Sequence, residues 1–170
     1  LDEAYFSFSG KSYLSLLRKY PNMIVLRTLS KIGLAGLRIG VLAASPEIVA
    51  ELNKIRLPYN INSLSQAAAV AVLKHRAIIE RQISLLISER ENLYNALARM
   101  TGVTAYPSET NFILFRTNTD ATAVYLKLKK AGILIKNLNR PGPLKNCLRV
   151  TIGTKEENRE FLKTLIKVLD

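Results

Sequence analysis

The sequence predicts an α/β protein in two parts, joined by a long helical stretch. Two observations predict the sheet of the first part: it contains short apolar runs rich in β-branched residues, and helices or loops separate them. The third observation is a change of pattern after residue 100, where strand, helix, strand, strand and helix follow one another as in a small α+β domain. We therefore expect one domain over residues 1–75, which includes the start of the connecting helix, and a second over residues 76–170.

The first domain is expected to contain three strand-like segments and two helices. The strands are residues 1–6, 23–26 and 37–44, and the first helix is residues 12–19. The second helix begins at Ser45-Pro46-Glu47, because serine caps helices and proline fits the first helical position. It should end before Pro58, since the residue that precedes a proline avoids helical geometry.

One long helix, or two helices in series, is expected from Ser63 to Met100. Ser63-Leu64-Ser65-Gln66 has the spacing of a capping box, and apolar residues then recur at helical spacing as far as Leu97. The second domain should add strands at 112–115, 133–135 and 148–152, a helix at 121–131 that Gly132 ends, and a last helix that the capping box Thr154–Glu157 opens.

The chain is strongly basic, with 25 lysine and arginine residues against 13 acidic ones and a net charge of +12. Such a balance is compatible with solvated helix faces, with a field that attracts phosphate-bearing small molecules, or with nucleic acid. The basic residues are dispersed, as in Leu126–Lys130 on the polar face of a predicted helix, and no nucleic-acid motif is present. This favours solvated faces, and we expect no nucleic-acid partner.

Several features indicate a cytoplasmic protein rather than a secreted or membrane protein. No apolar stretch approaches the roughly 20 residues of a membrane helix, and the acidic start Leu1-Asp2-Glu3 is unlike a signal peptide. The only cysteine, Cys147, has no partner for an internal disulfide and no metal-ligand cluster around it. We expect a small buried thiol in a strand, a reducing compartment and no metal site. The only histidine, His75, is expected at the surface.

The segment Thr28–Gly40 carries the most chemical information, because it lies between two predicted buried strands. It combines two hydroxyl residues, Lys31, three glycines and Arg38. Glycines let a backbone approach a ligand closely, and hydroxyl groups and guanidinium groups bind phosphate. A lysine in a cationic, partly desolvated pocket loses its proton more easily and reacts with carbonyl groups. The spacing is not that of a Walker loop, so the alternatives here are a phosphate site or an ordinary exposed lysine.

Two further segments are informative. Asp2-Glu3-Ala4-Tyr5 lies at the end of a predicted strand, where α/β proteins place ligand sites, although a solvated acid and a packed tyrosine would look the same. Cys147–Thr154 places Arg149 within an apolar strand, which is costly unless the arginine is paired. Arg149 therefore meets either an internal carboxylate or an anionic ligand.

Together and in this order, these segments resemble the fold-type I aminotransferases that use pyridoxal 5'-phosphate (PLP), and they are most similar to histidinol-phosphate aminotransferases. Leu57–Ser63, Thr110–Phe112 and Cys147–Thr151 also fit that family. The resemblance covers essentially the whole chain. It implies the C-terminal part of a PLP-dependent transferase fold: the tail of the large α/β domain, a long connecting helix and the small α+β domain. The chain has no counterpart of the family's N-terminal half, so we expect a fragment with little or no activity alone.

The resemblance implies a covalent cofactor site. Lys31 would bind PLP through its amine and, once the substrate amine replaces it, carry a proton between the substrate carbon and the cofactor. Asp2 would keep the pyridine nitrogen protonated, which makes the ring an electron sink, and Tyr5 would donate a hydrogen bond to the ring oxygen. The cofactor phosphate would be held by Thr28, Ser30 and Arg38.

The resemblance also implies the substrate contacts. Arg149 would bind the α-carboxylate of glutamate or 2-oxoglutarate, and Lys136 stands where many relatives have an arginine, so it offers a point charge instead of a planar fork. Tyr59 and Asn60 would be further substrate contacts. Another difference from many relatives is the spacing of seven residues between Lys31 and Arg38, which is one shorter.

The implied activity is transamination between histidinol phosphate and 2-oxoglutarate in L-histidine biosynthesis, by a cytoplasmic homodimer. Two alternatives stay open at this point. A related PLP enzyme would act on aromatic amino acids or on threonine phosphate. A basic module without catalysis would bind nucleic acid, with an affinity that falls steeply as salt rises.

Overall fold

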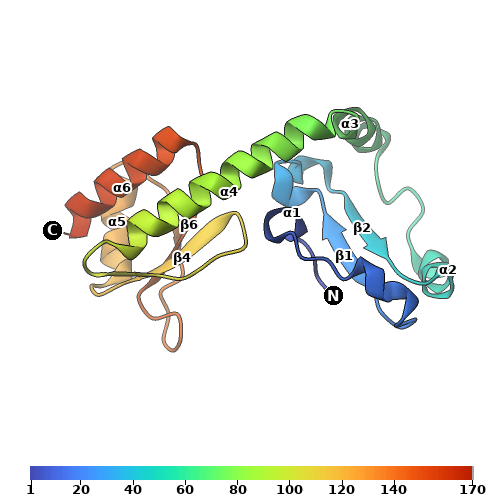
Figure 1. Ribbon diagram of the computed structural model, residues 1–170, viewed down its shortest axis with the longest axis horizontal. Coiled ribbons are helices and arrows are strands. Elements are labelled where there is room, and N and C mark those ends of the chain that lie inside the picture. Colours follow the sequence, from blue (N-terminus) through green and yellow to red (C-terminus); the bar gives the residue numbers. More distant parts are fainter. Residues whose placement is uncertain (170) are drawn as a thin grey trace. The chain divides into compact units, whose positions relative to one another are not determined.

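The computed structural model describes residues 1–169, which fold into two compact units, residues 1–83 and 84–169 (Figure 1). The boundary between the units falls within helix α4 (Arg76–Ala98), a little later in the chain than the boundary predicted from the sequence. The fold is mixed α/β, as predicted, and each unit has its own sheet.

The first unit is built on strand β1 (Val25–Thr28), which has neighbours on both edges. On one edge it pairs antiparallel with β2 (Gly40–Ala43), with Val25 opposite Ala43. On the other edge Asp2 forms a parallel bridge to Leu26, whose N–H and C=O bond to Leu1 and Glu3. The remaining elements are α1 (Phe6–Ser9), α2 (Pro46–Ile55) and α3 (Ser63–Leu73), and the 3₁₀ turns η1 (Leu14–Arg18), η2 (Ser30–Ile32) and η3 (Ala35–Leu37).

Two predicted strands of this unit are shorter than expected, for local reasons, whereas the strand predicted at 23–26 keeps its length and lies at Val25–Thr28. Residues 1–6 supply only the bridge at Asp2, because α1 begins at Phe6. The strand predicted from residue 37 begins instead at Gly40, since Leu37 closes η3 and Arg38 adopts a left-handed conformation with φ 56°. The predicted helix at 12–19 is the 3₁₀ turn η1.

The helix starts follow side-chain caps. Ser45 caps α2 as predicted, with its Oγ accepting from the Ile48 N–H at 3.5 Å. The capping box expected at Ser63 is wrong, because Asn62 is the cap and its Oδ1 accepts from the Ser65 N–H at 2.8 Å. The connecting stretch is two helices, α3 and α4, and exposed His75 lies in the turn between them.

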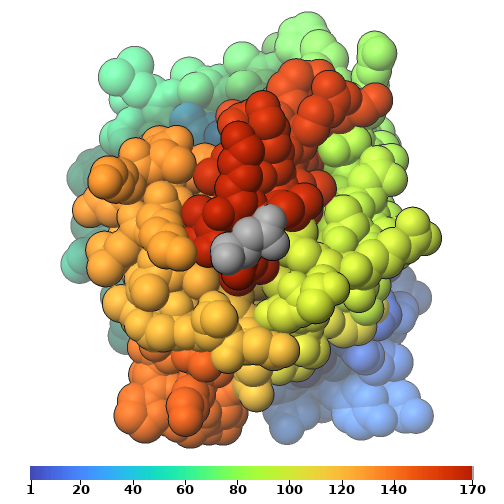
Figure 2. All heavy atoms as spheres, turned by 90° about the vertical axis from the view of Figure 1, so that its left-hand side faces the viewer, coloured from blue at the N-terminus to red at the C-terminus, as the bar shows by residue number. Residues whose placement is uncertain are grey.

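The second unit is an antiparallel sheet in the order β3-β4-β6-β5, with helices packed on one face. Figure 2 shows α6 lying between α5 and the last turns of α4 on this side of the unit. The strands are β3 (Val103–Ala105), β4 (Phe112–Thr117), β5 (Lys136–Asn137) and β6 (Cys147–Thr151), and the helices are α5 (Ala121–Lys130) and α6 (Lys155–Leu169).

The core of this unit lies between the sheet and the helices. Alternate residues of β4 face it, so that Ile113 and Phe115 are fully buried. Phe115 meets Phe161 of α6 edge to face, with ring centroids 6.0 Å apart. Cys147 is a buried thiol in a strand, as predicted.

In this unit two predicted helix ends were accurate, and one predicted strand was wrong. Thr154 and Glu157 form the predicted reciprocal cap, at 2.7 and 3.3 Å, and α5 ends just before Gly132, which is left-handed. The strand expected at 133–135 is absent, and β5 covers only two later residues. The reason is that the Ile133 N–H bonds back to Leu128 at the end of α5, which holds the chain away from β6 until Lys136.

Truncating the centre of the second core should be costly. Phe115→Ala removes a fully buried ring and should lower the free energy of unfolding by about 3–5 kcal/mol. The matched control is Leu126→Ala on α5, where the side chain is 57% exposed, and it should change stability by less than about 0.5 kcal/mol. Urea unfolding followed by circular dichroism measures both, and equal effects would contradict this assignment of the core.

Candidate active site

Lys31 lies in the 3₁₀ turn η2, directly after β1, and its side chain is half-buried. The Thr28 Oγ1 accepts from the Ser30 N–H at 3.0 Å and fixes the start of this turn, and Gly33 ends it with φ 91°. The Lys31 Nζ lies 5.5 Å from the centroid of the Tyr5 ring. An amine and a phenol are therefore held side by side at the end of β1.

Asp2 belongs to the same edge of the unit. The segment that carries Asp2 lies parallel to β1, because Asp2 forms a parallel bridge to Leu26. The carboxyl ends of parallel strands meet at one edge of a sheet, and such sheets bind ligands at that edge. The Asp2 side chain is exposed, and its Oδ1 accepts from the Ala4 N–H at 2.8 Å, which turns the chain towards Tyr5.

The hairpin that follows Lys31 brings Arg38 back to the hydroxyl residues. Thr28 donates from Oγ1 to the Ile39 carbonyl at 3.4 Å, and the Leu29 N–H bonds to the same carbonyl at 3.2 Å. Arg38 is exposed, and the hydrogen bond that its Nη1 donates to the Ala35 carbonyl is long, at 3.5 Å. Two hydroxyl groups and a guanidinium within one hairpin are a donor set that suits a phosphate group.

Tyr59 and Asn60 lie in a separate loop between α2 and α3. Tyr59 is 97% exposed and has a left-handed backbone with φ 58°. The Asn60 Oδ1 accepts from Arg56 at 3.1 Å. Within the first unit these two residues do not belong to the hairpin of Lys31.

Arg149 and Lys136 lie on the sheet of the second unit, directly opposite each other in the pairing of β6 with β5. Their side chains therefore leave the sheet on the same face. The Arg149 guanidinium stacks 4.7 Å from the centroid of the Phe112 ring. Its Nε is buried, and among residues 1–169 no atom accepts a hydrogen bond from it. Among the described residues the buried Nε of Arg149 thus has no carboxylate partner, which favours an anionic ligand.

Sequence reasoning missed a buried ion pair beside Asp2. The Glu3 side chain is only 4% exposed, and its Oε2 accepts from Nε and Nη2 of Arg27, at 3.0 and 2.9 Å. Its Oε1 accepts from the Tyr13 N–H at 2.6 Å. The Arg27 guanidinium also stacks on Phe6, 3.6 Å from the ring centroid. The available signal was an arginine within a short apolar strand, the same signal that drew attention to Arg149.

The environment of Glu3 favours its charged form. Burial raises the pKa of the Glu3 carboxyl, but hydrogen bonds from the Tyr13 N–H, the Arg27 guanidinium and the Ser12 hydroxyl together hold the pKa below its ordinary value of 4.5. The carboxylate is therefore ionised at neutral pH and remains paired.

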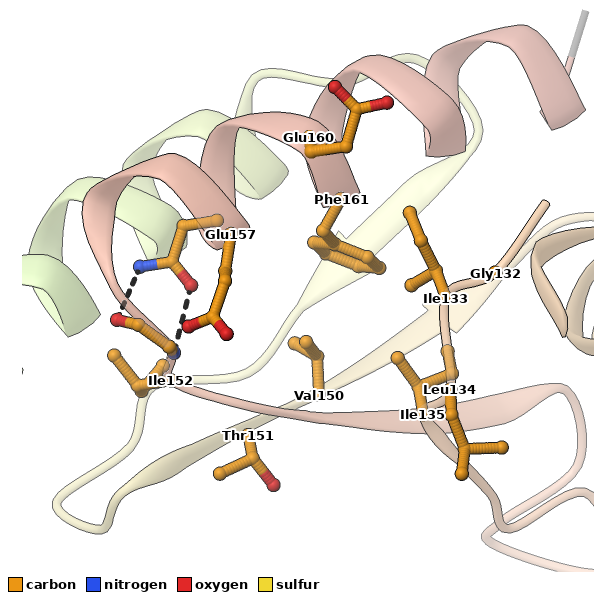
Figure 3. A pocket seen from close by; sticks show the side chains of 12 residues that line it. Gly132, Ile133, Leu134, Ile135, Val150, Thr151, Ile152, Glu157, Glu160 and Phe161 are labelled. Carbon is orange, nitrogen blue, oxygen red and sulfur yellow. Dashed lines mark hydrogen bonds between the residues drawn. The ribbon is translucent and has the colours of Figure 1, made fainter.

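The second unit also has a pocket of about 500 Å³, between residues 132–135, the end of β6 and helix α6. Figure 3 shows apolar side chains of Ile133, Val150 and Phe161 around it, with Glu157 and Glu160 on the side of α6. None of the predicted site residues and no lysine lines this pocket, so it is not a candidate for a covalent cofactor.

Residues 1–169 lack two other features, a metal-binding group and a membrane-spanning helix. No group of three histidine, cysteine or acidic residues there has an arrangement that would hold a metal ion. No helix in that range is both long enough and apolar enough to cross a membrane.

The fold is that of part of a PLP-dependent transferase, and comparison with known proteins agrees. The chain belongs to the class I and II aminotransferases, whose family model matches residues 1–165. It is similar to the histidinol-phosphate aminotransferase of Vesicomyosocius okutanii, with 46% identity over 167 residues, which cover 98% of this chain and 47% of the relative. The chain therefore spans about half the length of such relatives.

Solved structures show the same likeness. The histidinol-phosphate aminotransferase of Sinorhizobium meliloti in complex with PLP superposes with a TM-score of 0.86 at 29% identity, over 99% of this chain and 48% of that one. The L-threonine-O-3-phosphate decarboxylase of Porphyromonas gingivalis also gives a TM-score of 0.86, at 27% identity, over 99% of this chain and 54% of that one.

The lowered pKa of Glu3 predicts acid sensitivity. Because the folded pKa lies below the unfolded one, the contribution of the ion pair to stability is complete above the unfolded value near 4.5 and is lost as pH falls through the folded pKa. Glu3→Gln should cost roughly 2 kcal/mol at pH 7, and the gap to the wild type should narrow below pH 4.5. Unfolding free energies measured from pH 7 to pH 3 test this. A gap that stays constant throughout would contradict it.

Proposed function

We propose that the complete protein is a PLP-dependent aminotransferase that transfers an amino group between histidinol phosphate and 2-oxoglutarate, in L-histidine biosynthesis. The observation that carries the proposal is the position of the Lys31 amine. It lies 5.5 Å from the centroid of the Tyr5 ring, at the edge of the sheet to which Asp2 belongs. The names of the similar proteins support the choice of substrate.

The residues of the first unit fit the chemistry of PLP. When bound, this cofactor withdraws electrons from the carbon that carries the amino group. Lys31 supplies the amine that attaches the cofactor and later moves a proton at its Nζ. Asp2 holds the proton of the ring nitrogen, and Tyr5 donates a hydrogen bond to the ring oxygen. The phosphate is held by Thr28, Ser30 and Arg38.

The residues of the second unit fit an anionic substrate. The unpartnered Nε of Arg149 and its stacking on Phe112 prepare the guanidinium to bind a carboxylate with two parallel hydrogen bonds. Lys136, opposite Arg149, adds a second positive charge on the same face. We assign Tyr59 and Asn60 as further substrate contacts, since an exposed loop is free to meet a ligand. The proposal includes a homodimer in the cytoplasm, where the lone thiol of Cys147 stays reduced.

A second candidate is decarboxylation of threonine phosphate, which the likeness to the Porphyromonas gingivalis enzyme favours. Both substrates carry an amine and a phosphate, so the same cofactor residues serve either reaction. The complete protein should transaminate histidinol phosphate and should release no carbon dioxide from threonine phosphate. Release of carbon dioxide without transamination would select the second candidate.

The cofactor assignment predicts that Lys31 alone is responsible for a visible absorbance band. When PLP is added to the complete protein, an absorbance band that survives gel filtration should form in the wild type. The band should disappear in Lys31→Ala. The control is Lys54→Ala, which removes an exposed lysine of α2 that pairs with Glu51 at 2.6 Å, and the band should persist. A band retained by Lys31→Ala would refute the assignment.

The substrate assignment predicts a selective loss in Arg149→Met. Removal of charge-assisted hydrogen bonds should raise KM for 2-oxoglutarate by roughly 10- to 100-fold in the complete protein. Arg140→Met, at an exposed position in the loop before β6, should leave KM unchanged. Steady-state kinetics with both variants measure this, and equal KM values in Arg149→Met and the wild type would remove Arg149 from the substrate site.

A further inference from the structure

We infer that the buried ion pair of Glu3 and Arg27 is the positioning device of the cofactor site, and that it sets Asp2 and Tyr5 in register with Lys31. This inference rests on the proposed function, because it assigns a role relative to bound PLP. Neither residue touches the cofactor in this account, so both act through the residues beside them.

The pair connects the two backbone segments that carry the site. Glu3 stands between Asp2 and Tyr5 on the first segment, and Arg27 stands on β1, four residues before Lys31. Between the segments the backbone forms a short bridge, in which the Leu26 N–H bonds to the Leu1 carbonyl at 2.9 Å and the Glu3 N–H bonds to the Leu26 carbonyl at 2.8 Å. The two bonds from Arg27 to the Glu3 Oε2 add a side-chain connection at the same level.

The pair also fixes the chain on either side of Tyr5. The Arg27 guanidinium stacks on Phe6, immediately after Tyr5, at 3.6 Å from the ring centroid. Its Nη2 donates to the Ser12 Oγ at 2.7 Å, and the Glu3 Oε1 accepts from the Tyr13 N–H at 2.6 Å. The turn that holds Tyr5 is thus tied to β1 before and after the phenol.

The geometry favours orientation over binding as the role of this pair. Successive side chains of an extended segment point to opposite sides, so Glu3 points away from the side of Asp2. Glu3 is buried and saturated by its partners, whereas the Asp2 side chain is exposed. A buried ion pair is a weak source of net stability, but a planar guanidinium fixes the direction of its partner. That is the property needed to align the ring nitrogen partner, Asp2, with the amine of Lys31.

The test uses the complete protein with added PLP, and compares three variants with the wild type. Glu3→Gln keeps the size and the acceptor for the Tyr13 N–H but removes the charge. Arg27→Lys keeps the charge and removes the fork, and it maintains the test if Glu3→Gln does not fold. Val25→Ala is the structural control, because it truncates a fully buried residue of β1 that takes no part in the pair. The readouts are the dissociation constant of PLP and the visible circular dichroism per bound cofactor, which reports its orientation.

We expect Glu3→Gln to raise the dissociation constant by about tenfold and to diminish the visible circular dichroism per bound cofactor. Arg27→Lys should lie between it and the wild type. Val25→Ala should lower the unfolding midpoint and leave the circular dichroism unchanged.

Two results would overturn the inference while the proposed function stands: values for Glu3→Gln equal to those of the wild type, or an equal loss of circular dichroism in Val25→Ala. A wild-type chain without a band that depends on Lys31 would overturn the proposed function, and the inference with it.

Discussion

The ion pair between Glu3 and Arg27 is the interaction on which the first unit depends. The segment that bears Asp2 is joined to β1 by a short parallel bridge, whose backbone hydrogen bonds involve Leu1, Glu3 and Leu26. A carboxylate that is 4% exposed requires its partners, because an unpaired buried charge is costly. The same pair contacts Phe6, directly after Tyr5, and accepts the Tyr13 N–H. The ion pair therefore holds the segment that carries Asp2 and Tyr5 against β1.

The second unit differs from the first, because it has a continuous apolar core and a sheet whose two faces carry different kinds of side chain. One face of β4 and β6 packs Phe115 and Leu148 against the helices. The other face carries Arg149 and Lys136, directly opposite each other. Successive side chains of a strand point to opposite faces of the sheet. An arginine can therefore occupy an apolar strand, because its neighbours face the core and its own side chain lies on the other face. The buried Nε without an acceptor among residues 1–169 is then the feature that marks this face for a ligand.

Much of this structure was predictable from local patterns, and the differences have identifiable causes. Helix starts at Ser45 and Thr154 followed from cap chemistry that involves neighbours in sequence. The strand expected at 133–135 is absent, because the Ile133 N–H donates to the Leu128 carbonyl at the end of α5. In the candidate site, the hairpin of Lys31 was recognisable from its own residues. Glu3 was not, because its partner lies 24 residues away on β1, and a glutamate beside an aspartate looks like surface in a sequence.

The central claim is that Lys31 is the covalent attachment point of PLP, and site mapping tests it most directly. The complete protein is incubated with PLP, reduced with borohydride and digested, and the modified lysines are located by mass spectrometry. We predict a phosphopyridoxyl group on Lys31 with little label elsewhere, because this lysine lies beside the Tyr5 ring at the end of β1. Label distributed over many exposed lysines, without preference for Lys31, would contradict it.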